Sequence, residues 1–152
     1  MKNTELLSQN LRLINYFYTR NLSRELSSIQ ANHHVEVLLT LAKQQQPITQ
    51  NQLADLLHID KSRVAHIIFS MEENKIVRVE TNPNDRRQHL VSLSPDALKS
   101  IPDIEQKIIE INELANTGIS EEKLIVFTEV AEAMMQNLTK KKTRKNPSEN
   151  NQ

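Results

Sequence analysis

The amino-acid sequence predicts a mainly α-helical chain with one small β-hairpin, in which short helices and the hairpin lie between longer flanking helices. Apolar residues recur every three or four positions through most of the chain, which is the spacing of one face of a helix. Alternating β-branched segments are confined to residues 76–81 and 88–93, close enough to pair. We therefore expect flanking helices at 4–29 and 95–139 and a compact central unit at 33–94.

Composition limits the size and the chemistry of the chain. Its 152 residues suit one domain over residues 1–139, followed by a polar tail at 140–152 that we expect to be disordered. No apolar run approaches the roughly 20 residues of a membrane-spanning helix, and the polar N-terminus lacks a secretory signal, so we expect a cytoplasmic protein. The absence of cysteine excludes thiol chemistry, and the single glycine, Gly118, argues against the phosphate-binding loops of nucleotide enzymes.

A long helix is expected at the N-terminus. It carries one apolar stripe, made of Leu7, Leu11, Ile14, Tyr18, Leu22, Leu26 and Ile29. A helix of this length in a small domain must bury its stripe against the C-terminal helices or against a second copy of the chain. A shorter helix should follow at 33–43. Its inward residues are predicted to be Val35, Leu38, Leu39 and Ala42.

Two short helices joined by a sharp turn come next. Thr49 and Gln52 have the spacing of a capping box, which starts the first helix, and Asp60 is a suitable N-cap for the second. The predicted inward residues are Leu53, Leu56 and Leu57 in the first helix and Val64, Ile67, Ile68 and Met71 in the second. Such a pair has the form of a helix-turn-helix, whose second helix enters the DNA major groove.

The exposed face of the second short helix holds the candidate groove-contacting residues. They are Lys61, Ser62, Arg63, Ala65, His66 and Phe69. The two cations in the first turn suit phosphate, the serine and histidine can hydrogen-bond base edges, and the alanine or phenylalanine can touch a thymine methyl group. An ordinary surface helix with polar residues is the alternative.

A basic loop, NPNDRRQ, joins the two predicted strands, and its Asn and Pro residues favour a turn. Two adjacent arginines, Arg86 and Arg87, occupy its tip, where an anionic partner such as a narrow minor groove would offset their repulsion. We interpret Asp85 as a carboxylate that pairs with Arg87 and keeps the loop in shape. A soluble hairpin tip without a partner is the alternative.

Two further helices are expected after the hairpin. Ser94 and Pro95 form an N-cap followed by proline at the first helical position, and Pro102 should kink or delay this helix. Gly118 ends the helix, and Ser120 caps the next. The last helix carries a coiled-coil-like seam of Leu124, Phe127, Ala131, Met134 and Leu138. We assign this seam, with the first helix, to a dimer interface; packing within one chain is the alternative.

Charge is distributed unevenly although the formal net charge is zero. Residues 94–139 carry three lysines against nine acidic residues, whereas 61–87 carry six basic residues against four acidic ones. Five more basic residues lie at 140–145. The distribution suits a chain with one anion-facing surface, although runs of charge are often simply solvated.

Residues 48–94 resemble the core of the MarR (multiple-antibiotic-resistance regulator) family. The resemblance is carried by QLADLLHI, SMEENKIV and NPNDRRQHLVSLS, and the long helices on either side fit the family's dimeric architecture. It implies a homodimeric winged helix-turn-helix transcriptional regulator, with Ser62 and His66 in the recognition helix and Arg86 and Arg87 in the wing. It also implies double-stranded DNA as a partner, a repressor role and relief by a small-molecule effector.

The sequence departs from the family pattern at three places. Lys75 stands where a glycine is usual, so it would have to accept a left-handed conformation at a cost of about 1 kcal/mol. Asp96 and Ala97 follow the hairpin where a glycine is common. Ala65 and His66 replace a frequent Thr-Arg pair, and this replacement should change the base preference.

No catalytic constellation is evident, so we expect neither an enzyme nor a cofactor. The run His33-His34-x-Glu36 allows a metal-responsive alternative, although no cysteine or second histidine cluster supports it. An effector pocket like the family's would lie between the dimerisation helices and the winged domain. We expect its lining to be Leu13, Tyr16, Phe17, His34 and Leu38. A winged-helix protein-interaction module without strong DNA binding is a further alternative.

Overall fold

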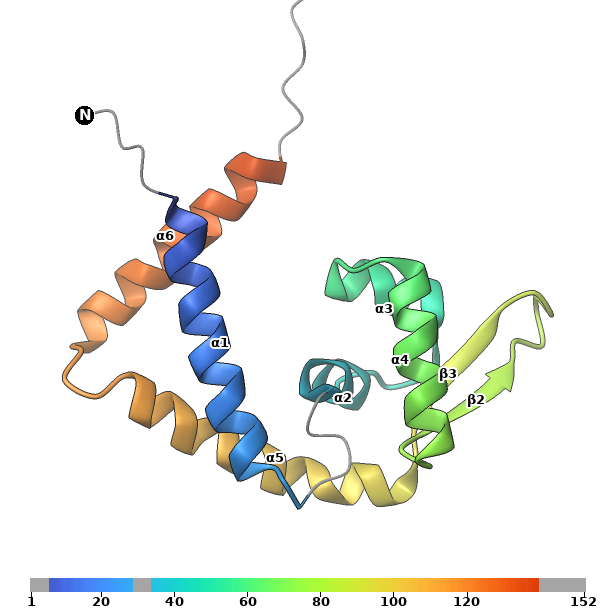
Figure 1. The fold of residues 1–152 in the computed structure, drawn as a ribbon. Helices are drawn as coiled ribbons and strands as arrows, with labels where there is room; N and C mark the ends of the chain where they lie inside the picture. Colours follow the sequence, from blue (N-terminus) through green and yellow to red (C-terminus); the bar gives the residue numbers. More distant parts are fainter. Residues whose placement is uncertain (1–5, 29–33, 140–152) are drawn as a thin grey trace, which may run out of the picture. The chain divides into compact units, whose positions relative to one another are not determined.

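The computed structural model describes residues 6–28 and 34–139 (Figure 1). Its elements are α1 (Leu7–Glu25), α2 (Val35–Ala42), β1 (Ile48–Thr49), α3 (Gln50–Leu57), α4 (Lys61–Glu73), β2 (Val77–Thr81), β3 (His89–Leu93), α5 (Pro95–Ala115) and α6 (Glu121–Thr139). The chain divides into two compact units, and the boundary between them in the sequence falls between Ala115 and Asn116. The predicted fold class, mainly helical with one small sheet, is confirmed. The predicted tail at 140–152 lies outside the described residues.

The helix-turn-helix is built from local hydrogen bonds. The Gln52 amide donates to the Thr49 hydroxyl at 3.1 Å, and the Thr49 amide donates to the Gln52 side chain at 2.8 Å, which completes the predicted capping box. His58, just after α3, has a left-handed backbone with φ 52°. Asp60 occupies the N-cap position of α4, but its side chain makes no capping hydrogen bond. Backbone geometry therefore defines the turn, with no contribution from the Asp60 carboxylate.

The wing belongs to a three-stranded antiparallel sheet in the order β1-β3-β2. All five residues of β2 pair with all five of β3. On the other side of β3, Ile48 pairs with Val91 and Thr49 with Leu90. The sequence did not predict β1, because two residues are too few to show a strand periodicity. This short strand connects the start of α3 to the hairpin.

The core of the first unit joins the helix-turn-helix to the sheet and to α5. Its most deeply buried side chains are Leu26, Leu38, Leu53, Val64, Ile68, Met71, Val91 and Ile104. The predicted inward face of α4 is confirmed, since its four residues are buried or half-buried. Two other predictions were partly wrong. Helix α2 buries Val37 and Leu41, which were not predicted, and Leu56 of α3 is 54% exposed.

Helix α1 is shorter than the predicted helix at 4–29, and only its C-terminal part reaches the core. Leu22 is buried, as is Leu26 just after the helix, whereas the N-terminal members of the predicted stripe are exposed. These exposed residues are Leu7, Leu11 and Ile14. Helix α1 packs against α5, where the Tyr18 hydroxyl donates to Asn112 Oδ1 at 2.8 Å.

Helix α5 runs without interruption from Pro95 to Ala115, with Pro102 inside it. The prediction that Pro102 would delay the helix was therefore wrong. Proline removes one backbone donor, but the flanking turns are held by the packing of Ile101 and Ile104 in the core.

Helix α6 lies in the second unit. Gly118, with φ 75°, precedes it and is consistent with the predicted stop after α5. No side chain of α6 is buried within the described chain. Of the predicted seam, Leu124 and Ala131 are half-buried, whereas Phe127, Met134 and Leu138 are exposed. Across residues 6–28 and 34–139, no helix combines the length and the hydropathy of a membrane span.

Candidate nucleic-acid interface

Helix α4 presents one face to solvent because its opposite face is buried in the core. Val64, Ile68 and Met71 are each only 1% exposed. All six predicted groove-contacting residues are exposed: Lys61, Ser62, Arg63, Ala65, His66 and Phe69. Figure 1 shows α4 beside the β2–β3 hairpin, and α4 contacts β2 directly.

The charge of this face changes along the helix. The first turn of α4 contains Lys61 and Arg63 and no acidic residue. The positive end of the helix dipole adds to these two cations, so this end favours phosphate. Glu72 and Glu73 lie at the other end, where their charge opposes phosphate binding.

The wing loop is shaped by short-range hydrogen bonds. The Asn82 amide donates to the Gln88 carbonyl at 3.0 Å, and the Gln88 amide donates to the Asp85 carbonyl at 2.9 Å. Asp85 Oδ1 accepts the backbone N–H of Arg87 at 3.0 Å. The predicted ion pair between Asp85 and the Arg87 guanidinium group is not present among the described residues, and the Asp85 carboxylate instead accepts a hydrogen bond from the Arg87 main chain within the loop.

This arrangement leaves the two wing cations without partners. Arg86 and Arg87 are exposed, and neither guanidinium group forms a hydrogen bond or an ion pair with any part of the chain that the structure describes. The Asp85 carboxylate accepts the Arg87 backbone N–H and forms no ion pair with either arginine in the described chain. The wing tip therefore presents two adjacent positive charges to solvent.

The turn between α4 and the wing contains the expected left-handed lysine. Lys75 has φ 59°. Its amide donates to the Glu72 carbonyl at 2.9 Å, and the Ile76 amide donates to the Met71 carbonyl at 2.9 Å. These two bonds form a Schellman motif, which usually takes glycine at the position of Lys75. The prediction of a left-handed lysine is confirmed, and the motif redirects the chain from α4 into β2.

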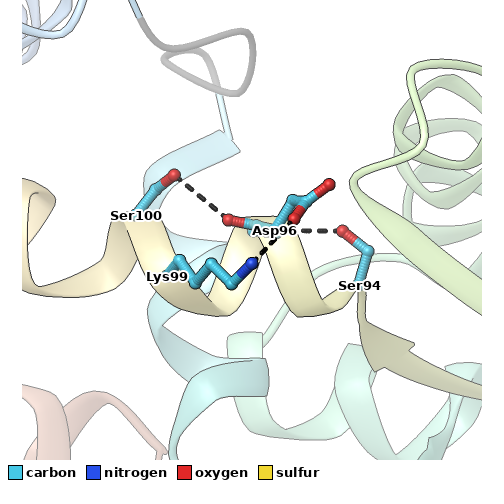
Figure 2. Close-up of polar contacts among 5 residues, drawn as sticks. Ser94, Asp96, Lys99 and Ser100 are labelled. Carbon is cyan, nitrogen blue, oxygen red and sulfur yellow. Dashed lines mark hydrogen bonds and ion pairs between the residues drawn. The ribbon is translucent and has the colours of Figure 1, made fainter.

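The second departure from the family pattern, at Asp96 and Ala97, requires no left-handed residue. Asp96 and Ala97 lie in the first turn of α5, with no left-handed residue among them. Figure 2 shows how this turn is held: the Ala97 amide donates to Ser94 Oγ at 3.2 Å, and the Ser100 hydroxyl donates to the Asp96 carbonyl at 3.3 Å. Ser94 therefore caps α5, as predicted.

The five residues predicted to line an effector pocket do not share one location. Leu38 is in the core, His34 is half-buried at the start of α2, and the three residues of α1 are at least 36% exposed: Leu13, Tyr16 and Phe17. A cavity of about 630 Å³ lies between α1, α2 and α5. It is lined by Asn15, Tyr18, Thr19, Leu22, Ser23, Val35, Glu36, Leu39 and Ile108. Two residues of the predicted apolar stripe of α1, Tyr18 and Leu22, line this cavity, whereas the residues of α1 predicted for the pocket do not.

The metal-responsive alternative receives no geometric support from the described residues. In the ranges 6–28 and 34–139, no group of three or more His, Asp or Glu side chains is arranged to hold a metal ion. His33, the first residue of the His-His-x-Glu run, lies outside these ranges.

An exposed helix anchored over a core, followed by a hairpin with a basic tip, defines a winged helix-turn-helix protein. Residues 35–89 match the model of the MarR family. A proposed transcriptional regulatory protein for the hcr operon of Thauera aromatica is 26% identical over 62 residues. That match covers 41% of this chain and 37% of that protein.

Solved structures share the fold over most of the chain. MarR matches with 22% identity and a TM-score of 0.76, over 91% of this chain and 94% of that one. The MepR–DNA complex of S. aureus matches with 19% identity and a TM-score of 0.80, over 88% of this chain and 98% of that one. The central segment of the chain thus matches the MarR family model, and the fold over most of the chain is the one seen in these solved structures.

Proposed function

We propose that this protein is a sequence-specific DNA-binding transcriptional regulator that acts as a homodimeric repressor. The observation that carries the proposal is the pairing of an anchored, outward-facing α4 with a wing whose two guanidinium groups are unpaired. The MepR structure that shares this fold is a complex with DNA, which supports the same use of the fold here.

In this proposal, α4 enters the major groove and the wing reaches the adjacent minor groove. Lys61 and Arg63 contact phosphates at the N-terminal end of α4, where the helix dipole has the same sign. Ser62 and His66 hydrogen-bond to base edges. Arg86 and Arg87 enter the minor groove, whose negative potential attracts arginine, and Asp85 holds the loop that presents them.

Exposed apolar residues support a dimer. Helix α6 buries none of its side chains within the described chain, although it carries Ile125, Val126, Phe127, Val130, Met134, Met135 and Leu138. A helix of this kind gains most of its stability from packing, so it requires a partner surface. The N-terminal half of α1 has the same character. In a dimer, two α4 helices about 34–36 Å apart would read a pseudo-palindromic operator.

A small-molecule effector would relieve repression by favouring a dimer in which the two α4 helices have a different separation. The ligand can shift this equilibrium only through its differential affinity for the two states. The cavity between α1, α2 and α5 lies where the long helices meet the core. A ligand bound in this cavity would therefore change the position of the winged domain.

Binding to the DNA upstream of the protein's own gene tests the proposed function. We expect a sequence-selective complex in gel-shift titrations that weakens as salt increases. His66→Ala should change the order of preference among operator variants while leaving the salt dependence nearly unchanged. A complex that requires zinc would favour the metal-responsive alternative.

One observation favours a protein-interaction module as a second candidate. Helix α4 carries two basic residues, Lys61 and Arg63, against the two acidic residues Glu72 and Glu73, so its net charge is zero. The absence of any salt-sensitive, sequence-selective shift in the same titration would favour this candidate and contradict DNA recognition.

A further inference from the structure

A hollow of about 400 Å³ lies between α4 and the wing strands. Its lining consists of Gln50, Ala65, Ile68, Phe69, Glu72, Val79, Thr81 and His89. Ala65 and Phe69 also belong to the outward face of α4, whereas Val79, Thr81 and His89 come from the hairpin. The hollow is therefore continuous with the surface that the proposed function places against DNA.

The chemistry of the hollow does not suit phosphate. Its lining includes no lysine or arginine, and its one formally charged side chain is Glu72. Much of the remaining lining is apolar. Within the major groove, the matching groups are the methyl group of thymine, which is apolar, and the exocyclic amino groups of cytosine and adenine, which donate hydrogen bonds.

Phe69 and Glu72 are both available for such contacts. The Phe69 side chain is 59% exposed, in contrast to its neighbour Ile68, which is 1% exposed and anchors the helix. The Glu72 carboxylate has no hydrogen-bond or ion-pair partner among the residues that the structure describes. Residues three positions apart are neighbours on a helix surface, so the two side chains can act on adjacent bases.

We propose that this hollow is a base-reading site, in which Phe69 and Ala65 contact thymine methyl groups. Glu72 accepts a hydrogen bond from an exocyclic amino group of a neighbouring base. The inference rests on the proposed function and adds to it a class of DNA sequence, namely half-sites in which thymine lies next to cytosine or adenine. Gln50, Thr81 and His89 form the polar rim.

Replacement of thymine by uracil tests the site, because it removes only the methyl group. The probe is a duplex selected from a random-sequence pool by the wild-type protein, made once with thymine and once with uracil at the half-site positions. Wild-type protein should bind the uracil duplex about fourfold more weakly for each methyl group contacted, which corresponds to one buried CH₂ group. Phe69→Ala should lower the thymine-to-uracil affinity ratio by about fourfold for each methyl group that Phe69 contacts, leaving only the part due to Ala65, and Phe69→Leu should lower the ratio less.

Two controls separate this site from the wing and from folding. The double variant Arg86→Ala with Arg87→Ala should bind both duplexes more weakly but keep the thymine-to-uracil ratio of the wild type. Phe69 is exposed, so Phe69→Ala should keep the wild-type thermal unfolding midpoint. Glu72→Gln can donate as well as accept, so pools selected by this variant should tolerate keto-bearing bases beside thymine.

The outcomes are distinct. Equal wild-type affinity for the thymine and uracil duplexes, or an unchanged ratio in Phe69→Ala, would overturn the base-reading site while leaving sequence-selective DNA binding intact. Failure of the wild-type protein to select any sequence from the pool would overturn the proposed function and this site together.

Discussion

The winged helix-turn-helix and helix α6 differ in where their apolar residues find partners. Every element from α2 to α5 except the short strand β1 buries at least one apolar side chain within the described chain. Helix α6 is 19 residues long and buries none. The difference indicates that the winged helix-turn-helix has a core of its own, whereas the stability of α6 must come from packing against a further surface, which the proposed dimer would provide.

Truncation of one buried leucine should give the largest effect. Leu53 is 0% exposed in α3, so Leu53→Ala should lower the free energy of unfolding by about 3–5 kcal/mol, through lost burial and a cavity. Leu56→Ala is the matched control on the same helix, and its change should stay within about 0.5 kcal/mol because Leu56 is 54% exposed. Urea denaturation measures both. Similar effects for the two variants would contradict the assignment of the α3 core face.

Truncation of an exposed residue of α6 should act on association more than on folding. Phe127→Ala should raise the dimer dissociation constant by up to about a thousandfold, because the substitution removes one Phe side chain from each copy and each buried Phe contributes about 2 kcal/mol. Glu129→Ala, on the opposite face of α6, serves as the control. Light scattering coupled to size exclusion at micromolar concentration gives the result. A monomeric wild-type protein would show that the apolar face of α6 is not a dimer interface.

Helix α1 lies between the winged helix-turn-helix and α6 in how much of its apolar surface is buried, because only its C-terminal half packs against the core. Tyr18→Phe removes the hydrogen bond to Asn112 and should lower the free energy of unfolding by about 1 kcal/mol. Burial raises the pKa of Tyr18 above its usual value, so the stability due to the neutral phenol is complete below the unfolded pKa. That stability is lost as pH rises through the folded pKa. The free energy of unfolding of Tyr18→Phe should therefore fall less steeply with rising alkaline pH than that of the wild type. Identical alkaline denaturation curves for the two proteins would contradict the contribution of Tyr18.

The parts of the fold that sequence reasoning predicted are those with local signals. The Thr49–Gln52 capping box, the buried stripe of α4 and the hairpin each depend on residues a few positions apart, and all three are present. Local chemistry was sufficient at these three places. The left-handed Lys75 was predicted from the resemblance, because Lys75 stands where the family usually has glycine.

The remaining errors arise from tertiary packing, which sequence periodicity does not encode. Helix α2 has apolar residues on more than one side, so only its neighbours determine that Val37 and Leu41 are buried. In α1 the predicted apolar stripe already contained Tyr18, which lines the cavity, whereas the effector-pocket prediction took Tyr16 and Phe17 from other positions on the helix. The hollow beside Phe69 was missed because sequence periodicity does not show which face of the hairpin lies against α4, although the two elements are consecutive in the chain.

The salt dependence of DNA binding tests the central claim most directly. Each phosphate neutralised by a cation contributes about −0.9 to the slope of log affinity against log salt concentration. Arg86→Ala with Arg87→Ala removes two cations from each protomer, so in the proposed homodimer it should make the slope shallower by up to about four and weaken binding to all sequences. Arg20→Ala with Arg24→Ala on α1, which changes the net charge equally, should leave the slope unchanged. A wing variant with the wild-type slope and affinity would contradict the assignment of this surface to DNA.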